Sequence, residues 1–175
     1  MQPPHRQGRE QREVTKKLVD ELLGQDIISR SSSPWPSPIT IVKKKDGSPR
    51  FRVDFRGVDK HLSVLKYPLP RIDDVLQCFE GKKYFSVLDL VSGFWQIPLK
   101  EEDKHDTAFV TSDELFEWNR LPFGLASSPA YFQQLMDLVI QGMKWACAIA
   151  YVDDIIITPI PDKATLKTWS VCSWR

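Results

Sequence analysis

The sequence predicts an α+β fold, because a few segments with helical periodicity are separated by pairs of short strand-like runs that are suited to antiparallel hairpins. Apolar residues recur every three to four positions over residues 10–23, 71–80 and 128–144, which is typical of helices with one buried face. Between them lie short runs rich in β-branched and aromatic residues, bounded by Gly, Pro and Asp. With 175 residues, 42% of them hydrophobic, the chain can bury a core and is too apolar to be disordered.

The first expected element is an amphipathic helix over residues 10–23, with Val14, Leu18 and Leu22 on one stripe. The stretch 29–38 that follows ends in three prolines at alternate positions. Each proline fixes its own φ angle and disfavours helix at the residue before it. We therefore expect an extended connector that runs along the surface.

A basic β-hairpin is expected next. The runs 39–45 and 50–55 are separated by Asp46-Gly47, a dipeptide that readily adopts the positive φ angles of tight hairpin turns. The stretch 41–56 carries six Lys or Arg residues against two Asp, although the formal net charge of the whole chain is only +1. Such a segment can bind phosphate groups, and a solvated basic face is the alternative.

The second half of the chain is expected to hold a strand over 83–90, a hairpin over 106–121 and a helix from Ser128 to about Lys144. Ser128-Pro129 is well suited to begin that helix. Its expected buried positions are Phe132, Leu135, Met136, Val139 and Met143.

Adjacent acids form the strongest chemical signal. Asp153 and Asp154 lie between two apolar runs, 145–152 and 155–157, which indicates two strands joined at these acids. Burying them is costly without a partner, and oxygen ligands suit Mg²⁺; a solvated hairpin tip is the alternative. Asp89 also ends an apolar strand, and if it pairs beside the hairpin, three carboxylates converge as two-metal phosphoryl transfer requires.

Other metal sites and membrane association are not expected. The three cysteines and three histidines are scattered, without C-x-x-C or H-E-x-x-H spacing. The longest apolar run is far below the ~18 residues of a membrane helix, and the opening residues lack the apolar core of a signal peptide. We expect an intracellular protein, cytoplasmic or nuclear, that is neither secreted nor bound to a membrane.

Six motifs follow one another between about Glu10 and Thr158: SPWPSPITIVKKKDGSPRFRVDFRGVDK, YPLPRIDDVL, KYFSVLDLVSGFWQIPL, DTAFVT, LPFGLASSPAYFQQLMD and YVDD. In order and spacing they closely resemble the reverse transcriptase of gypsy-type LTR retrotransposons, and more distantly the retroviral enzymes. The resemblance implies a right-hand polymerase fold. This chain would supply the fingers and an incomplete palm, with the thumb, connection and RNase H absent.

The resemblance also implies a division of the chain. Residues 1–9 would form an N-terminal tail and residues 10–83 a fingers-like region with the helix, connector and basic hairpin. Residues 84–158 would form the palm with the catalytic carboxylates. Residues 159–175 match no motif of the family and would be a divergent C-terminal tail.

Catalytic and metal-binding roles carry over by motif. The first palm aspartate of the family falls on Asp89 in VLDL, and its paired aspartates fall on Asp153 and Asp154 in YVDD. These three carboxylates and the main-chain carbonyl of Leu90 would bind two Mg²⁺ ions, for which Mn²⁺ can substitute.

Four further residues match positions around the incoming nucleotide. Phe94 matches the aromatic residue that blocks a ribose 2′-hydroxyl, with a core aromatic as the alternative. Phe123 and Gly124 in LPFG match the loop beside the nucleotide. Tyr151 would lie near the primer terminus, with a buried strand tyrosine as the alternative.

The resemblance assigns Lys44 and Arg50 to the triphosphate of the dNTP. A two-residue turn would place Lys43 opposite Arg50, whereas a three-residue turn would place Lys44 there, which is the register that we favour. The basic residues expected to contact phosphates of the nucleic acid are Arg52, Arg56, Lys60 and Arg71.

Two functions remain open. The first is an RNA-directed DNA polymerase module that extends a primer on an RNA or DNA template with dNTPs. The second is a truncated, catalytically silent retroelement remnant that at most binds nucleic acid or a partner. A general two-metal nuclease is disfavoured relative to both, because it leaves the KKKDG and LPFG motifs unexplained. The oligomeric state, and whether another chain supplies the missing lobes, are left open.

Overall fold

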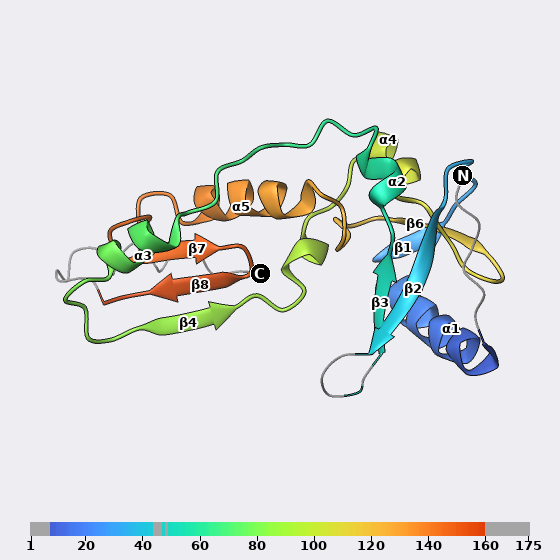
Figure 1. Cartoon of the computed structure of the whole chain (residues 1–175), viewed down its shortest axis with the longest axis horizontal. Helices are drawn as coiled ribbons and strands as arrows, with labels where there is room; N and C mark the ends of the chain where they lie inside the picture. Colours follow the sequence, from blue (N-terminus) through green and yellow to red (C-terminus); the bar gives the residue numbers. More distant parts are fainter. Residues whose placement is uncertain (1–7, 44–46, 48, 160–175) are drawn as a thin grey trace. The chain divides into compact units, whose positions relative to one another are not determined.

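The computed structural model describes residues 8–43, 47 and 49–159. The chain forms two compact units that alternate along the sequence. Unit 1 comprises Met1–Lys66 and Ser92–Pro129, and unit 2 comprises Tyr67–Val91 and Ala130–Arg175. Both combine helices with a β-sheet, which confirms the α+β class (Figure 1). Among the described residues, no helix has the length and apolar character needed to cross a membrane.

Unit 1 is built on a five-stranded sheet of order β1-β6-β5-β2-β3. All neighbours are antiparallel except β2 and β5, which are parallel. The strands are β1 (Ile28–Arg30), β2 (Ser37–Lys43), β3 (Pro49–Val53), β5 (Phe109–Val110) and β6 (Leu115–Trp118). The helices are α1 (Arg9–Gly24), α2 (Arg56–Asp59), α4 (Glu101–Lys104) and the 3-10 helices η1 (Gly93–Gln96) and η2 (His105–Thr107).

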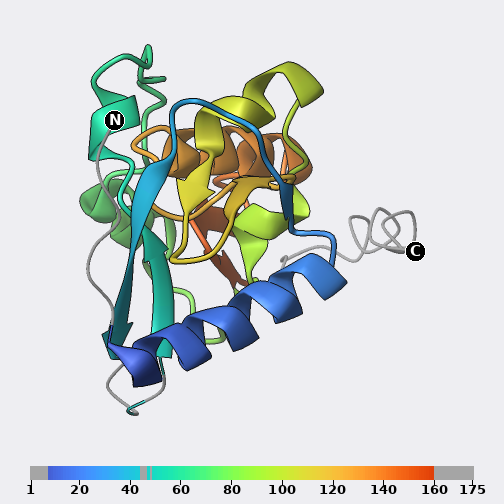
Figure 2. The same ribbon diagram turned by 90° about the vertical axis from the view of Figure 1, so that its right-hand side faces the viewer.

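Helix α1 packs on the sheet of unit 1 (Figure 2). The predicted helix is confirmed, but its stripe was partly wrong, because Thr15, Val19 and Leu22 are its buried residues. Thr15 can be buried since its hydroxyl donates to the Gln11 carbonyl oxygen at 2.8 Å, which satisfies the polar group inside the helix. Val19 and Leu22 join a core that includes Phe55 and Phe109.

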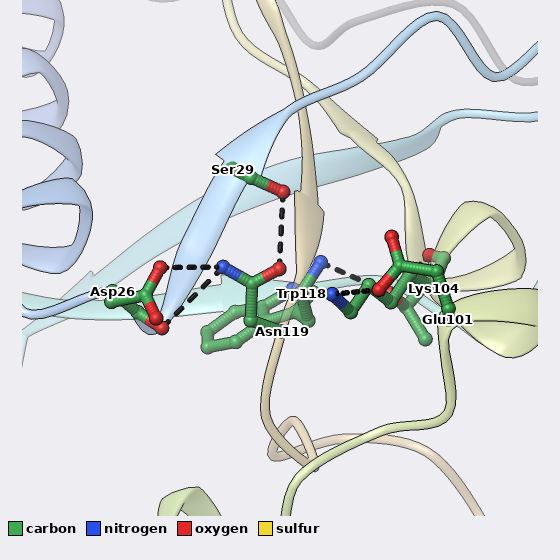
Figure 3. Close-up of polar contacts among 7 residues, drawn as sticks. Asp26, Ser29, Glu101, Lys104, Trp118 and Asn119 are labelled. Carbon is green, nitrogen blue, oxygen red and sulfur yellow. Dashed lines mark hydrogen bonds and ion pairs between the residues drawn. The ribbon is translucent and has the colours of Figure 1, made fainter.

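The expected connector contains a strand that the sequence pattern did not reveal, since β1 is only three residues long and pairs with β6. Asn119 fastens the turn before β1, where Asp26 adopts a φ of 55°. The Asn119 Nδ2 atom donates to Asp26 Oδ1 at 3.1 Å, and Ser29 Oγ donates to Asn119 Oδ1 at 3.1 Å (Figure 3). The backbone N–H of Trp118, the residue before Asn119, donates to Thr107 Oγ1.

Strands β2 and β3 form the predicted hairpin, but neither proposed register is right. Val42 pairs with Arg50 and Lys43 pairs with Pro49. Proline can begin a strand because a terminal position needs no N–H donor, so the pairing extends beyond the expected start at Arg50. This register places neither Lys43 nor Lys44 opposite Arg50. Lys44 lies outside the described residues.

Unit 2 holds a three-stranded antiparallel sheet of order β4-β8-β7. Its strands are β4 (Ser86–Asp89), β7 (Ala148–Tyr151) and β8 (Asp154–Ile157). Its helices are α3 (Ile72–Cys78) and α5 (Ser128–Val139), of which the residues from Ala130 belong to this unit. Helix α5 lies along the sheet (Figure 1).

Helix α5 ends at Val139, five residues before the expected end, and Gly142 with a φ of 87° lies in the turns that follow. Phe132 and Met136 are buried as predicted, but Leu135 and Val139 are 39% and 36% exposed and Met143 is half-buried. The helix turns Gln133 inward instead, where it is fully buried. Helical spacing alone therefore located the buried face of this apolar helix only in part.

Candidate active site

Strand pairing in unit 2 brings the three predicted carboxylates to neighbouring backbone positions. Asp154 is the first residue of the central strand β8, and it pairs with Asp89 on one side and Tyr151 on the other. The turn residues Val152 and Asp153 join β7 to β8, and the Leu90 N–H donates to the Asp153 carbonyl oxygen at 3.1 Å. The expected pairing of Asp89 beside the acidic hairpin is therefore confirmed.

Asp153 has the most perturbed environment of the three acids. Burial raises the pKa of Asp153, and the nearby negative charges of Asp89 and Asp154 raise it further. The Asp153 Oδ1 atom is buried and has no hydrogen-bond partner among the described residues. A buried oxygen without a donor, beside two like charges, fits a bound cation.

The side chains themselves are less convergent than the backbone. Asp89 and Asp154 are exposed, and the described residues contain no group of three or more His, Cys, Asp or Glu side chains that could hold a metal ion. The donor chemistry still suits Mg²⁺, because this ion binds through one or two carboxylates and keeps waters or substrate phosphates as its other ligands.

Gln133 ties helix α5 to the acidic turn. Its Nε2 atom donates to the Ala150 carbonyl oxygen at 2.9 Å, and its Oε1 atom accepts the Val152 N–H at 2.9 Å. Val152 has a φ of 51°, a conformation that is costly for a β-branched residue. The sequence analysis did not identify Gln133, because nothing in its spacing separates it from the exposed Gln134 beside it.

Asp137, one turn after Gln133, anchors a second polar cluster. Its carboxylate accepts hydrogen bonds from Gln133 Nε2 at 3.0 Å, from Tyr67 Oη at 2.8 Å and from the Lys144 ammonium. Partial burial alone would raise the pKa of Asp137, but the hydrogen bonds from Lys144, Tyr67 and Gln133 hold it below its usual value. The cluster connects α5 to Tyr67, which precedes α3 in the sequence, and to Lys144, which follows α5.

The residues predicted to surround the nucleotide divide between the units. Tyr151 is 41% exposed in unit 2, so it is not the buried strand tyrosine of the alternative interpretation. In unit 1, Phe94 is buried and stacks on Phe123 with 4.7 Å between ring centroids. Gly124 has a φ of 107°, and a Cβ there would lie 3.2 Å from the Val53 carbonyl oxygen. Their assignment to a nucleotide pocket stays a prediction.

The basic residues that were predicted to contact phosphates differ in the side chains that they bond to in the structure. Arg50 and Arg52 are exposed two positions apart on β3, so they lie on one face of the strand. Arg56 is held by Asp54 through two side-chain hydrogen bonds of 2.9 and 2.6 Å, which raise the pKa of Arg56. Lys60 is exposed, and Arg71 lies 3.9 Å from Asp73.

Comparisons with known proteins point to one family. The family model for reverse transcriptase (RNA-dependent DNA polymerase) matches residues 42–170. The chain is 39% identical over 170 residues to the retrovirus-related Pol polyprotein from transposon 412 of Drosophila melanogaster, covering 93% of this chain and 14% of the relative. It is 37% identical over 150 residues to the enzymatic polyprotein of cauliflower mosaic virus, strain Strasbourg, covering 83% and 22%. The chain thus spans a minor part of these relatives.

Solved structures agree with the sequence comparison. The foamy viral protease-reverse transcriptase in complex with an RNA/DNA hybrid superposes with a TM-score of 0.83 at 26% identity, over 97% of this chain and 23% of that chain. The same protein in complex with dsDNA gives a TM-score of 0.83 at 27% identity, over 97% and 35%. The chain has the fingers and palm fold of these enzymes, and it belongs to the reverse transcriptase family found in the Pol polyproteins of retroelements.

Proposed function

We propose that this chain is the nucleotidyl-transfer module of a retroelement polyprotein, which adds deoxynucleotides from dNTPs to the 3′-hydroxyl of a primer. The observation that carries the proposal is the pairing of Asp89 with Asp154 beside the buried, unpartnered Oδ1 of Asp153. Foamy viral relatives bound to an RNA/DNA hybrid and to dsDNA support a primed RNA or DNA template as the partner.

Reverse transcriptases generally use divalent metal ions. The residues that would hold two Mg²⁺ ions here are Asp89, Asp153, Asp154 and the main-chain carbonyl of Leu90, and Mn²⁺ can replace Mg²⁺. When bound, such ions activate the attacking hydroxyl and neutralise charge on the leaving diphosphate. The chain's own contribution is to fix these oxygens on paired strands and on a turn held by Gln133.

The other assignments follow from position in the motifs. Lys44 and Arg50 would neutralise the triphosphate, and the Phe94–Phe123 stack beside Gly124 would shape the sugar site. Tyr151 would contact the primer terminus. The exposed Arg52, Lys60 and Arg71 would bind nucleic-acid phosphates, whereas Arg56 would first have to exchange its bonds to Asp54.

Primer extension on an RNA template with Mg²⁺ or Mn²⁺ tests the proposal. Asp153→Asn should abolish extension, since the amide cannot supply the same charge, while Asp113→Asn at an exposed position of unit 1 should not. Extension by Asp153→Asn at the parent rate would exclude the metal assignment. Circular dichroism of both variants controls for folding.

A second candidate is nucleic-acid binding without catalysis, which the lack of a three-carboxylate group among the described side chains favours. This candidate predicts that the folded parent chain binds a primed template but does not extend it with either metal. Extension by the parent that is lost in Asp153→Asn would exclude it.

A further inference from the structure

Both polar atoms of the Gln133 carboxamide are hydrogen-bonded inside unit 2. The side chain is fully buried, and its Nε2 atom donates to the Ala150 carbonyl oxygen at 2.9 Å and to Asp137 Oδ1 at 3.0 Å. Its Oε1 atom accepts the Val152 N–H. Because the nitrogen of a carboxamide only donates and its oxygen only accepts, these partners fit one of its two orientations.

Of these three partners, Asp137 alone lies outside the β7–β8 hairpin. An ionised carboxylate only accepts hydrogen bonds, so it can face Nε2 of Gln133 but not Oε1. Turning the carboxamide over would place its oxygen against two acceptors, the Asp137 carboxylate and the Ala150 carbonyl. It would also leave the Val152 N–H facing a donor. The negative charge of Asp137 therefore opposes a rearrangement that would release the acidic turn.

Two further donors hold the Asp137 carboxylate in place. Its Oδ2 atom accepts from Tyr67 Oη at 2.8 Å and from the Lys144 ammonium. Only 9% of the Asp137 side chain is exposed, so water competes little for these bonds. Tyr67, Lys144 and Gln133 are not among the residues predicted to bind the nucleotide or the nucleic acid. An effect of Asp137 on transfer would therefore reach the site through Gln133.

We propose that Asp137 is a positioning residue for the nucleotidyl-transfer site, which keeps Gln133 in the orientation that holds the acidic turn. The proposal rests on the proposed function and adds to it a residue that bonds to no carboxylate of the site. Val152 needs this hold because its φ of 51° is costly for a β-branched residue. Without it, Val152 would relax to a negative φ and carry the next residue, Asp153, with it.

Asp137→Asn tests this role, because an asparagine can offer Gln133 the wrong atom. The Lys144 ammonium would attract the asparagine oxygen, so the asparagine nitrogen would face Gln133 Nε2 and two donors would meet. In primer extension, kcat should fall about ten-fold, as is usual for residues that orient metal ligands, while KM for dNTP should stay within about two-fold. Asp74→Asn, at an exposed position of α3 in the same unit, is the matched control.

Removal of Lys144 separates a role in orientation from a role in stability alone. Without the ammonium, the asparagine can turn its oxygen towards Gln133, so Lys144→Met added to Asp137→Asn should recover most of the lost kcat. Lys144→Met alone should change kcat little, since Asp137 still offers Gln133 only acceptors. A role in stability alone predicts the opposite for the double variant, because each substitution then removes a stabilising bond and the double variant is the worst of the three.

Hydrogen exchange of the Val152 N–H, followed by NMR, gives a readout that needs no catalysis. Exchange should be about ten-fold faster in Asp137→Asn than in the parent and should slow again in the double variant. The Thr158 N–H, which donates to the Cys147 carbonyl oxygen at 2.8 Å in the same unit, is the reference for global opening.

Two results would overturn the positioning role. One is Val152 exchange in Asp137→Asn that rises no more than Thr158 exchange, and the other is a double variant with a lower kcat than Asp137→Asn. A parent chain that extends no primer would refute the proposed function and the effect on kcat. In that case faster Val152 exchange in Asp137→Asn would still support the orientation of Gln133 by Asp137, and unchanged exchange would overturn that as well.

Discussion

The side-chain carbonyl of Gln133 accepts the backbone N–H of Val152, so a buried glutamine on helix α5 fixes the first residue of the acidic turn. The same side chain donates to the Ala150 carbonyl oxygen, two residues earlier. The hairpin is thus clamped on both sides of Tyr151. Because Asp153 follows Val152 directly, the geometry of the turn depends on an amide that touches no carboxylate of the site.

Replacing Gln133 by Leu should destabilise the protein, because the Ala150 carbonyl and the Val152 N–H both lose a buried partner. The expected cost is about 1–3 kcal/mol for each backbone group left unsatisfied. Urea unfolding measures it, with Gln134→Leu at the exposed neighbouring position as the matched control. Equal stability of the two variants would show that the turn does not need the clamp.

The central pairing of the site could be predicted from the sequence. Asp89 and the Asp153-Asp154 pair each interrupt or end an apolar run, and runs of that length and composition form strands. Two strands that present acids at their ends can then pair with the acids together. The structure confirms this, with Asp89 opposite Asp154.

Other features could not be predicted from the pattern of apolar and polar residues, because they depend on partners that are distant in sequence. Gln133 and Gln134 are adjacent residues of the same type, and only the position of β7 decides which of them is buried. The hairpin register places Arg50 opposite Val42, which the dipeptide Asp46-Gly47 does not reveal. Leu135 and Val139 are apolar yet exposed, since an apolar helix has several faces that could serve equally well.

Gly124→Ala should destabilise unit 1 by more than about 1 kcal/mol, since alanine is strained at a positive φ and its Cβ would lie 3.2 Å from the Val53 carbonyl oxygen. Gly24→Ala is the control, because Gly24 lies in α1 without a positive φ, and a Cβ added there would meet nothing within 4 Å. Thermal unfolding compares the two. A neutral Gly124→Ala would indicate that this loop can move away from β3.

The cluster around Asp137 should make stability depend on acidity. Hydrogen bonds from Lys144, Tyr67 and Gln133 lower the pKa of Asp137 in the folded state, so the folded protein binds this proton less readily than the unfolded chain, whose Asp titrates near ~3.9. The contribution is complete above the unfolded pKa and is lost as pH falls through the lower, folded pKa. Asp137→Asn should therefore lower the urea midpoint at pH 7 and flatten its decline below about pH 4.

Asp113→Asn, at an exposed position of unit 1, is the control for that titration. The urea midpoint of this variant should equal that of the parent protein both at pH 7 and below about pH 4. If Asp137→Asn kept the full acid-dependent decline of the parent, other carboxylates would account for it.

Phe94→Ala should raise incorporation of ribonucleotides relative to deoxynucleotides, if the Phe94–Phe123 stack limits space at the sugar. The substitution also empties a buried site, which costs about 3–5 kcal/mol for a core phenylalanine, so a loss of stability cannot separate a sugar-selecting role from a packing role. The ratio of kcat/KM for the two nucleotides separates them, because uniform loss of folded protein cancels from it. Phe116→Ala, at another buried aromatic residue of unit 1, should lose comparable stability and keep the parent ratio. An unchanged ratio in Phe94→Ala would leave Phe94 as a core aromatic.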